Sequence, residues 1–135
     1  MKTDRIFIEV PSENKYIRKA SSAILSSLSP YGVGHERLFD IKLCVEEAVR
    51  NAILHGNQLD KKLHVKVSYL IADGRINIEV EDEGPGYDPH TIPDPTRRGN
   101  ITRESGRGLC LIRRLMDRVE FNKKGNKILM EKSLK

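Results

Sequence analysis

The sequence contains no tryptophan, and aromatic residues make up only 5% of its 135 residues. Proteins that bind single-stranded nucleic acid rely on aromatic side chains that stack on bases and alternate with basic ones. No segment of this sequence has that composition. Nucleic-acid binding is therefore a minor alternative, and we expect no direct contact with nucleic acid.

Long apolar runs are also missing. No segment approaches the roughly 18 to 20 apolar residues of a membrane span. The opening segment MKTDRIFIEV lacks the apolar stretch and the small-residue cleavage site of a secretory signal. These absences predict a cytoplasmic protein that does not enter a membrane.

Cysteine is scarce, because the chain has only Cys44 and Cys110. The two lie far apart in segments with helical patterns, and neither belongs to a CxxC or another metal-type spacing. We expect both to be small buried hydrophobic residues that stay reduced, rather than a disulfide pair or metal ligands.

No block of like charge stands out, although 24 basic residues exceed 19 acidic ones and give a net charge of +5. Such an excess suits phosphate groups or an acidic protein surface, and it equally suits plain solubility. The length and the 38% hydrophobic content suit a single domain, residues 1–135, with one core.

Hydrophobic periodicity and turn residues predict a mixture of strands and helices. In order along the chain, the predicted elements are a strand at 5–10, helices at 13–28 and 35–55, strands at 63–71 and 76–81, a helix at 106–117 and strands at 118–122 and 127–133. Asp73-Gly74 lies between the two middle strands and signals a tight turn, so these strands should pair as an antiparallel hairpin.

Residues 46–57, EEAVRNAILHGN, place a carboxylate and an amide on one face of the predicted second helix. Glu47 and Asn51 are four residues apart, so they lie one turn apart on that face. Glu46 lies about 100° round the helix from Glu47 and is expected at the surface. Taken alone, such a pair is most often a solvated surface feature. A separate apolar stripe is expected to face the core and consists of Leu38, Ile41, Val45, Ala48 and Ala52.

The segment DEGPG at 82–86 combines a carboxylate with flexible backbone. Asp82 follows a predicted strand, so its carboxylate can stay fixed and accept a hydrogen bond from the exocyclic amine of a flat ligand. Gly84 and Gly86 leave room for a ring that a Cβ would block. An ordinary turn between two elements is the alternative.

The segment SGRGL, from Ser105 to Leu109, lies at a predicted loop-to-helix junction. The first N–H groups of a helix lack intrahelical partners and, together with the helix dipole, form an anion site. Gly106 and Gly108 would let a phosphate come close, and Arg107 would add charge. A role in packing alone is the alternative.

Between these two glycine segments, residues 87–105 contain three prolines and show no sustained periodicity. Loops of this length inside compact domains are often lids over active sites. Arg97, Arg98 and Arg103 of this predicted lid are further candidates for a contact with a terminal phosphate.

Together these motifs suit a nucleotide with a metal ion. Asn51 can supply an oxygen ligand to Mg²⁺, an ion that mostly keeps water and phosphate ligands. Glu47 would lie near the same phosphates and can accept a proton from an attacking hydroxyl or water. The sequence has neither a P-loop GxxxxGK[ST] nor the HRD and DFG motifs of protein kinases, which excludes the usual phosphate-binding routes.

The ordered set E-x-x-x-N, D-x-G-x-G and G-x-G-L resembles the Bergerat, or GHKL, ATP-binding fold of gyrase, Hsp90, histidine kinases and MutL. The phrases VEEAVRNAILHGN, VEDEGPGYDP and SGRGLCLIRRLMDRVEF look most like bacterial anti-sigma-factor serine kinases of the RsbW type. The resemblance implies an α/β (α+β) two-layer sandwich, with a mixed, mostly antiparallel sheet and three main helices on one face. It also implies ATP and Mg²⁺ as cofactors, bound under a lid at about 87–105.

By the same resemblance, Glu47 is the catalytic base, Asn51 binds Mg²⁺ and ATP, and Asp82 recognises adenine. The other residues implied to line the nucleotide are Gly84, Gly86, Arg103, Ser105, Gly106, Arg107, Gly108 and Leu109. One departure concerns the last strand, where the family often has Gly-Thr and this chain has Gly125-Asn126. Asn126 is the candidate replacement for the threonine hydroxyl near adenine.

The resemblance implies an ATP-dependent protein serine kinase that phosphorylates a STAS-type anti-anti-sigma protein and sequesters a sigma factor. One alternative is a nucleotide-gated binding module without meaningful phosphotransfer. Another is a switch-type kinase that regulates a partner phosphatase and binds no sigma factor.

The partners themselves are not identified by the sequence. The resemblance suggests a homodimer that uses the early strand and helix. On that helix, Lys15, Arg18, Lys19 and Ser22 form a basic polar face that would suit an acidic partner, although such faces are more often simply solvated.

Overall fold

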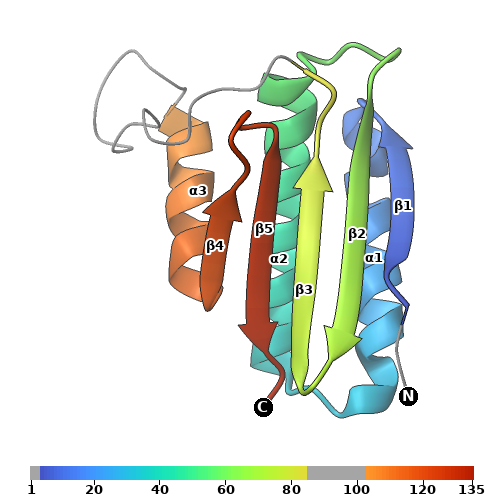
Figure 1. The fold of residues 1–135 in the computed structure, drawn as a ribbon, viewed down its shortest axis with the longest axis vertical. Helices are drawn as coiled ribbons and strands as arrows, with labels where there is room; N and C mark the ends of the chain where they lie inside the picture. The colour runs from blue at the N-terminus through green and yellow to red at the C-terminus, as the bar shows by residue number, and fades with distance from the viewer. Residues whose placement is uncertain (1–3, 85–102) are drawn as a thin grey trace.

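The computed structural model describes residues 4–84 and 103–135, which form five strands and three α-helices (Figure 1). The strands are β1 (Ile6–Pro11), β2 (His64–Ala72), β3 (Arg75–Glu81), β4 (Arg118–Phe121) and β5 (Lys127–Ser133). The helices are α1 (Ile17–Leu28), α2 (His35–Asn51) and α3 (Arg103–Leu115). Three short helical turns accompany them: η1 (Asn14–Tyr16), η2 (Ser29–Tyr31) and η3 (Ala52–Gly56).

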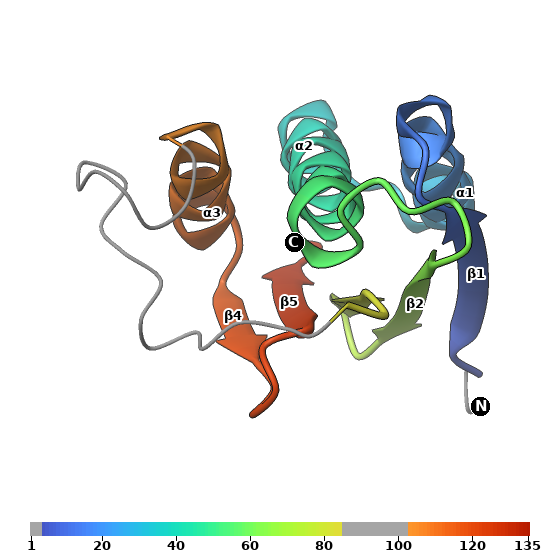
Figure 2. The same cartoon turned by 90° about the horizontal axis from the view of Figure 1, so that it is seen from above.

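The five strands form one sheet in the order β1-β2-β3-β5-β4. All three helices lie on one face of this sheet (Figure 2). The predicted two-layer sandwich is therefore confirmed. The sheet was expected to be mixed and mostly antiparallel, and among the described strands every pairing is antiparallel.

The central hairpin of β2 and β3 follows from alternation and turn chemistry. Along β3, Ile76, Ile78 and Val80 are buried, and the residues between them are not. Asp73 and Gly74 have positive φ values of 53° and 71°, as a two-residue turn between twisted strands requires. The predicted hairpin and its turn are both confirmed.

Helix α2 lies between α1 and α3 and packs against both (Figure 2). Four residues of its predicted apolar stripe are buried, because Ile41 and Val45 are 0% exposed, Ala48 is 3% exposed and Ala52 is 6% exposed. The fifth, Leu38, is only partly buried and packs against the edge of the core. Burying this stripe fixes the rotation of the helix about its axis. Glu46 consequently faces α1, and Glu47 faces α3.

Helix α3 begins earlier than predicted. The helix expected to begin at residue 106 begins at Arg103, so Gly106 and Gly108 lie within the helix and not at a loop-to-helix junction. Each glycine inside a helix costs about 1 kcal/mol relative to alanine. Burial of Leu109 against the core offsets this cost. Of the predicted lid, residues 87–102 lie outside the described part of the chain.

The two cysteines differ in their surroundings. Cys44 is a free thiol, and burial raises its pKa to about 12, which suits a small core residue. Cys110 is free but exposed, so the prediction that both are buried is wrong for this residue. Its neighbours on α3, Leu109 and Ile112, take the buried positions, and Cys110 consequently lies on the outer side of the helix.

Strand β1 is one edge of the sheet (Figure 1). Its first two residues are apolar yet accessible, with Ile6 43% exposed and Phe7 75% exposed. An edge strand has backbone groups that no other strand of the sheet pairs, and apolar side chains beside them favour contact with another surface. Across residues 4–84 and 103–135, no helix has the length and apolarity needed to cross a bilayer.

Candidate functional site

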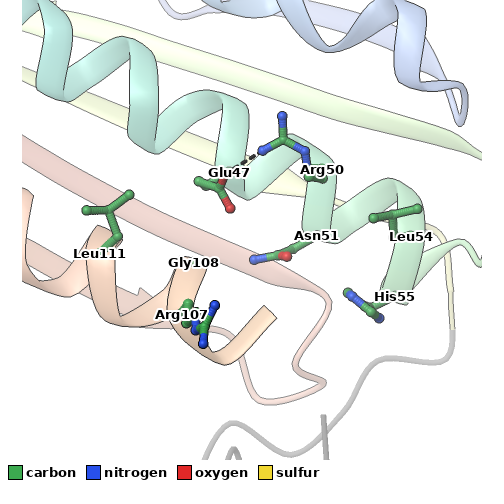
Figure 3. A pocket seen from close by; sticks show the side chains of 8 residues that line it. All are labelled: Glu47, Arg50, Asn51, Leu54, His55, Arg107, Gly108 and Leu111. Atoms are coloured by element: carbon green, nitrogen blue, oxygen red, sulfur yellow. Dashed lines mark hydrogen bonds and ion pairs between the residues drawn. The ribbon is translucent and has the colours of Figure 1, made fainter. Parts of the chain in front are cut away.

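A cavity of about 350 Å³ lies between α2 and α3 (Figure 3). Its lining residues are Glu47, Arg50, Asn51, Leu54, His55, Arg107, Gly108 and Leu111. Glu47 and Asn51 both line it, which confirms that this pair shares one face of α2. The Asn51 side chain points toward α3, and within the described residues its amide has no hydrogen-bond partner. An amide oxygen is therefore available to a ligand in this cavity.

Gly108 brings the backbone of α3 against the Glu47/Asn51 pair. A Cβ added at Gly108 would lie 2.6 Å from Oε2 of Glu47 and 3.5 Å from Nδ2 of Asn51. Real Cβ atoms essentially never approach another heavy atom within 3.0 Å. The glycine motif and the carboxylate–amide pair therefore meet at one site, although they are far apart in the sequence.

The Glu47 carboxylate is held from two sides. Oε1 accepts a hydrogen bond from Nη1 of Arg50 in an ion pair, and Oε2 faces Gly108. The Glu47 side chain is 21% exposed and the Arg50 side chain is 40% exposed, so the pair lies at the mouth of the cavity and not deep inside it. Arg50 was not predicted as a site residue, although its spacing from Glu47 is a known helical ion-pair spacing.

Asp82 lies beyond Asn51, at the end of β3, and is only 6% exposed. Its Oδ1 accepts a hydrogen bond of 2.9 Å from the Gly84 N–H. Burial raises the pKa of the Asp82 carboxyl above its ordinary value of 3.8, and the hydrogen bond from Gly84 opposes that rise. A buried carboxylate of this kind is a strong acceptor for a donor group on a ligand.

Glycine is required at position 84 because of a close contact with the backbone of Gly56, which was not predicted. A Cβ at Gly84 would lie 1.8 Å from the Gly56 carbonyl oxygen, and a Cβ at Gly56 would lie 2.2 Å from Cγ of Asp82. The turn after α2 and the loop after β3 therefore pack backbone to backbone beside the buried carboxylate. In the described structure, the space next to Gly84 is filled by Gly56 and not left open for a ring.

A second, much smaller cavity of about 20 Å³ lies next to the Asp82 carboxylate. Its lining residues are Asn51, Ala52, Val80, Asp82, Leu109, Phe121, Gly125, Asn126, Lys127 and Ile128. This volume holds about one water molecule. The apolar walls around one buried carboxylate suit a purine chemically, but a ring enters only if walls such as Leu109 and Phe121 move apart. Asn51 lines both cavities and connects the two halves of the site.

A family model of the histidine kinase-like ATPase domain matches residues 10–132. The chain belongs to this family. The match covers both cavities and the elements around them, and membership in the family implies the use of ATP. The predicted GHKL fold is thereby confirmed.

Relatives within the histidine kinase-like ATPase family agree with the more specific resemblance. The serine-protein kinase RsbW of Listeria monocytogenes serovar 1/2a is 27% identical, over 96% of this chain and 87% of that protein. The anti-sigma F factor of Clostridium perfringens strain SM101 is 36% identical, over 91% of this chain and 90% of that protein. The RsbW-type resemblance is confirmed, and these relatives support the predicted protein kinase and anti-sigma activities.

A solved structure shows the same fold. The crystal structure of the RsbU and RsbW domains of a Mycobacterium tuberculosis protein superposes with a TM-score of 0.68 at 21% sequence identity. The superposition covers 98% of this chain but 33% of that one. This chain therefore corresponds to one third of the solved chain, which contains two domains.

Asn126, the residue expected to replace a threonine near the nucleotide, is 8% exposed and contacts Asp82. Its Nδ2 donates to the Asp82 carbonyl at 3.0 Å, and its own carbonyl accepts from the Asp82 N–H at 2.9 Å. Its Oδ1 accepts from Nδ2 of Asn122 at 2.7 Å. In this structure Asn126 therefore holds the backbone of Asp82 at the end of β3.

Asn57, which lies just beyond the predicted helix at 35–55, supports the loop that carries Asp82. It is 2% exposed, and its Nδ2 donates to Ser12 Oγ at 2.9 Å and to the His64 carbonyl at 3.0 Å. Its Oδ1 accepts from the Glu83 N–H at 2.8 Å. One side chain thus ties the ends of β1 and β2 to the loop that carries Asp82.

Glu46 was expected at the surface, and this expectation is wrong. Its side chain is only 14% exposed, less than that of Glu47 at 21%. Glu46 Oε2 accepts from Ser21 Oγ of α1 at 2.8 Å and lies 3.6 Å from Nζ of Lys42. The angle between the two glutamates was right, but the side of α2 that carries Glu46 is covered by α1.

The other predicted nucleotide-binding residues fall into three groups. Arg107 is exposed and lines the larger cavity, and Leu109 is buried and lines the smaller one. Gly106 is buried inside α3, and the backbone of Arg103 and Ser105 forms the start of that helix. The remaining predicted residues lie outside the described part of the chain: Gly86, Arg97 and Arg98.

Proposed function

We propose that this protein is an ATP-dependent protein serine kinase that phosphorylates a STAS-type anti-anti-sigma protein and also sequesters a sigma factor. The observation that carries the proposal is the meeting of Glu47, Asn51 and Gly108 at one cavity. A carboxylate can accept a proton, an amide oxygen can bind a metal ion, and a glycine backbone lets phosphate come close. The relatives, named as a serine-protein kinase and an anti-sigma factor, support the substrate class.

The proposed reaction transfers one phosphoryl group. The serine hydroxyl oxygen of the partner forms a bond to the γ-phosphorus of ATP, the bond from that phosphorus to the β–γ bridging oxygen breaks, and ADP leaves. Glu47 accepts the hydroxyl proton. Asn51 would hold Mg²⁺ through its amide oxygen, and a bound Mg²⁺ neutralises the charge that develops on the phosphates.

At the other end of the site, Asp82 would accept a hydrogen bond from the exocyclic amine of adenine. The raised pKa of this carboxyl reflects the low polarity around it, and a donor from the base would stabilise its charged form there. Leu109 and Phe121 would separate to admit the ring, because the cavity between them is about 20 Å³.

The same proposal includes a homodimer, a single domain over residues 1–135 and a cytoplasmic location. The apolar edge formed by Ile6 and Phe7 supports a contact between two copies through β1. Light scattering gives the molecular mass of the protein and of a Phe7→Glu variant, and so shows whether each is a dimer. We expect a dimer for the first and a monomer for the second, and equal masses would contradict the use of this edge.

Replacement of the proposed base tests the kinase. We expect Glu47→Gln to lower phosphate transfer from labelled Mg-ATP to a STAS-domain protein by about 100-fold or more, because general bases contribute on that scale. Nucleotide binding and sigma-factor binding should persist, since the substitution removes only a charge. Glu36→Gln, an exposed residue of the same helix, is the matched control and should transfer phosphate at the normal rate.

The second candidate function is a nucleotide-gated module that binds partners without phosphotransfer. The ion pair between Arg50 and Glu47 favours it, because one oxygen of the proposed base is occupied. Normal binding of ATP and sigma factor, with no transfer to any STAS-domain protein, would establish this function and overturn the kinase. A pull-down from the native cell that yields a phosphatase and no sigma factor would instead point to a switch-type kinase.

A further inference from the structure

Arg50 belongs to two cavities at once. Besides the cavity between α2 and α3, it lines a groove of about 680 Å³ between α1 and α2. The residues of this α1–α2 groove are Asn14, Lys15, Ile17, Arg18, Glu46, Arg50 and Leu54. Leu54 is the other residue common to both cavities. The guanidinium that holds Glu47 therefore lies where the groove and the candidate active site meet.

The charges of the α1–α2 groove favour a carboxylate. Lys15, Arg18 and Arg50 contribute three positive charges, and the negative charge of Glu46 is engaged by Ser21 and Lys42. Within the described residues, neither Lys15 nor Arg18 belongs to an ion pair with an acidic side chain. Nζ of Lys15 lies 5.3 Å from the centre of the Tyr16 ring, a weak contact at an exposed side chain. Both cations can therefore bind a negatively charged segment that enters the groove.

We propose that Arg50 is a positioning residue that couples this groove to the base. An acidic segment of the phospho-acceptor protein binds in the α1–α2 groove, and its carboxylate draws the Arg50 guanidinium away from Glu47. Oε1 of Glu47 is then free to accept the hydroxyl proton. The proposal rests on the proposed kinase function. In it, the ion pair with Arg50 occupies the base until an acceptor protein binds.

Arg50 can exchange Glu47 for another carboxylate at a small cost in free energy. The Arg50 side chain is 40% exposed, and ion pairs with this exposure are weak because water screens them. The guanidinium does not have to leave the cavity that it lines, since the groove begins at the same side chain. In Figure 3 the Arg50 side chain extends away from α3, whereas Asn51 extends toward it.

Hydrolysis of ATP by water, without any partner protein, reports directly on whether Glu47 is free. We expect Arg50→Gln to raise this basal rate by about two- to fivefold, the range that a weak exposed ion pair can impose. Arg50→Lys keeps a positive charge beside Glu47 and should stay near the normal rate. Lys42→Gln is the matched control, because Lys42 is 44% exposed and pairs with Glu46 on the same helix, and its rate should not change.

A hexaglutamate peptide, which has no hydroxyl to phosphorylate, is the probe for the groove. It should speed basal hydrolysis by the unmodified protein, and it should have no effect on Arg50→Gln or on an Lys15→Gln/Arg18→Gln double variant. A basal rate of Arg50→Gln at or below normal would overturn the proposal, as would a peptide effect that survives these substitutions. The Glu47→Gln variant separates failure of the kinase from failure of the coupling. A normal basal hydrolysis rate in Glu47→Gln overturns the kinase. If Glu47→Gln loses hydrolysis but Arg50→Gln hydrolyses ATP at the normal rate, only the coupling is overturned.

Discussion

Oε2 of Glu47 lies so close to Gly108 that a Cβ on this residue would come within 2.6 Å of it. The contact joins the two helices that border the larger cavity and sets the position of the proposed base. Because the crowded atom is the end of a flexible side chain, a small residue at position 108 would displace the carboxylate rather than break the fold.

Gly108→Ala should therefore separate stability from activity. Alanine inside a helix is favoured over glycine by about 1 kcal/mol, so we expect an unchanged or slightly higher melting temperature. ATP hydrolysis should fall about tenfold or more, because a displacement of about 1 Å at a catalytic group is costly. Calorimetry and a hydrolysis assay on the same sample measure both. A parallel loss of stability and activity would mean that the helices had moved instead.

Gly84→Ala, in contrast to Gly108→Ala, should lower the stability of the fold. The added Cβ would lie 1.8 Å from the Gly56 carbonyl oxygen, which is backbone and cannot rotate away. We expect a loss of about 3 kcal/mol or more of unfolding free energy, at the upper end of the cost of overpacking. Urea denaturation measures it. Gly34→Ala is the control, since a Cβ there meets nothing within 4 Å, and equal stability of the two variants would contradict the predicted clash.

Local pattern was sufficient to predict most of the fold. The hairpin at Asp73-Gly74 and the rotation of α2 depend on turn chemistry and on apolar spacing, which are properties of neighbouring residues. The meeting of Glu47 and Asn51 on one face follows from helical geometry alone. The resemblance in motif order then brought Gly108 to the same site.

Contacts between distant segments could not be predicted in this way. Glu46 is covered because α1 packs on that side of α2, and Ser21, its partner, carries no sequence signal of that role. Asn57 joins Ser12, His64 and Glu83 only after three strands have assembled. The early start of α3 likewise depends on the burial of its apolar side, which outweighs the low helix propensity of its glycines.

Asn126→Ala should weaken the part of the site around Asp82, the residue proposed to bind adenine. The substitution removes the hydrogen bond to the Asp82 carbonyl and leaves Nδ2 of Asn122 without its acceptor. Loss of partners for such groups costs about 1–3 kcal/mol. We expect lower unfolding free energy in urea and weaker ATP binding by calorimetry. Asn126→Thr should recover part of the binding, and identical binding by both variants would argue against a role of the side chain at the nucleotide.

Asp82→Asn should alter how stability depends on pH. The folded state raises the pKa of this carboxyl above 3.8 mainly through burial, so the folded protein binds the proton more tightly than the unfolded chain. Ionised Asp82 therefore costs stability above the folded pKa, and this cost disappears as pH falls through that pKa toward 3.8. Asparagine can still accept the Gly84 hydrogen bond without the charge. We expect Asp82→Asn to be more stable than the unmodified protein at neutral pH, with a difference that shrinks on acidification, and to bind ATP poorly. Urea denaturation across pH measures the first effect, and a pH-independent difference would show that burial of the charge is not its cause.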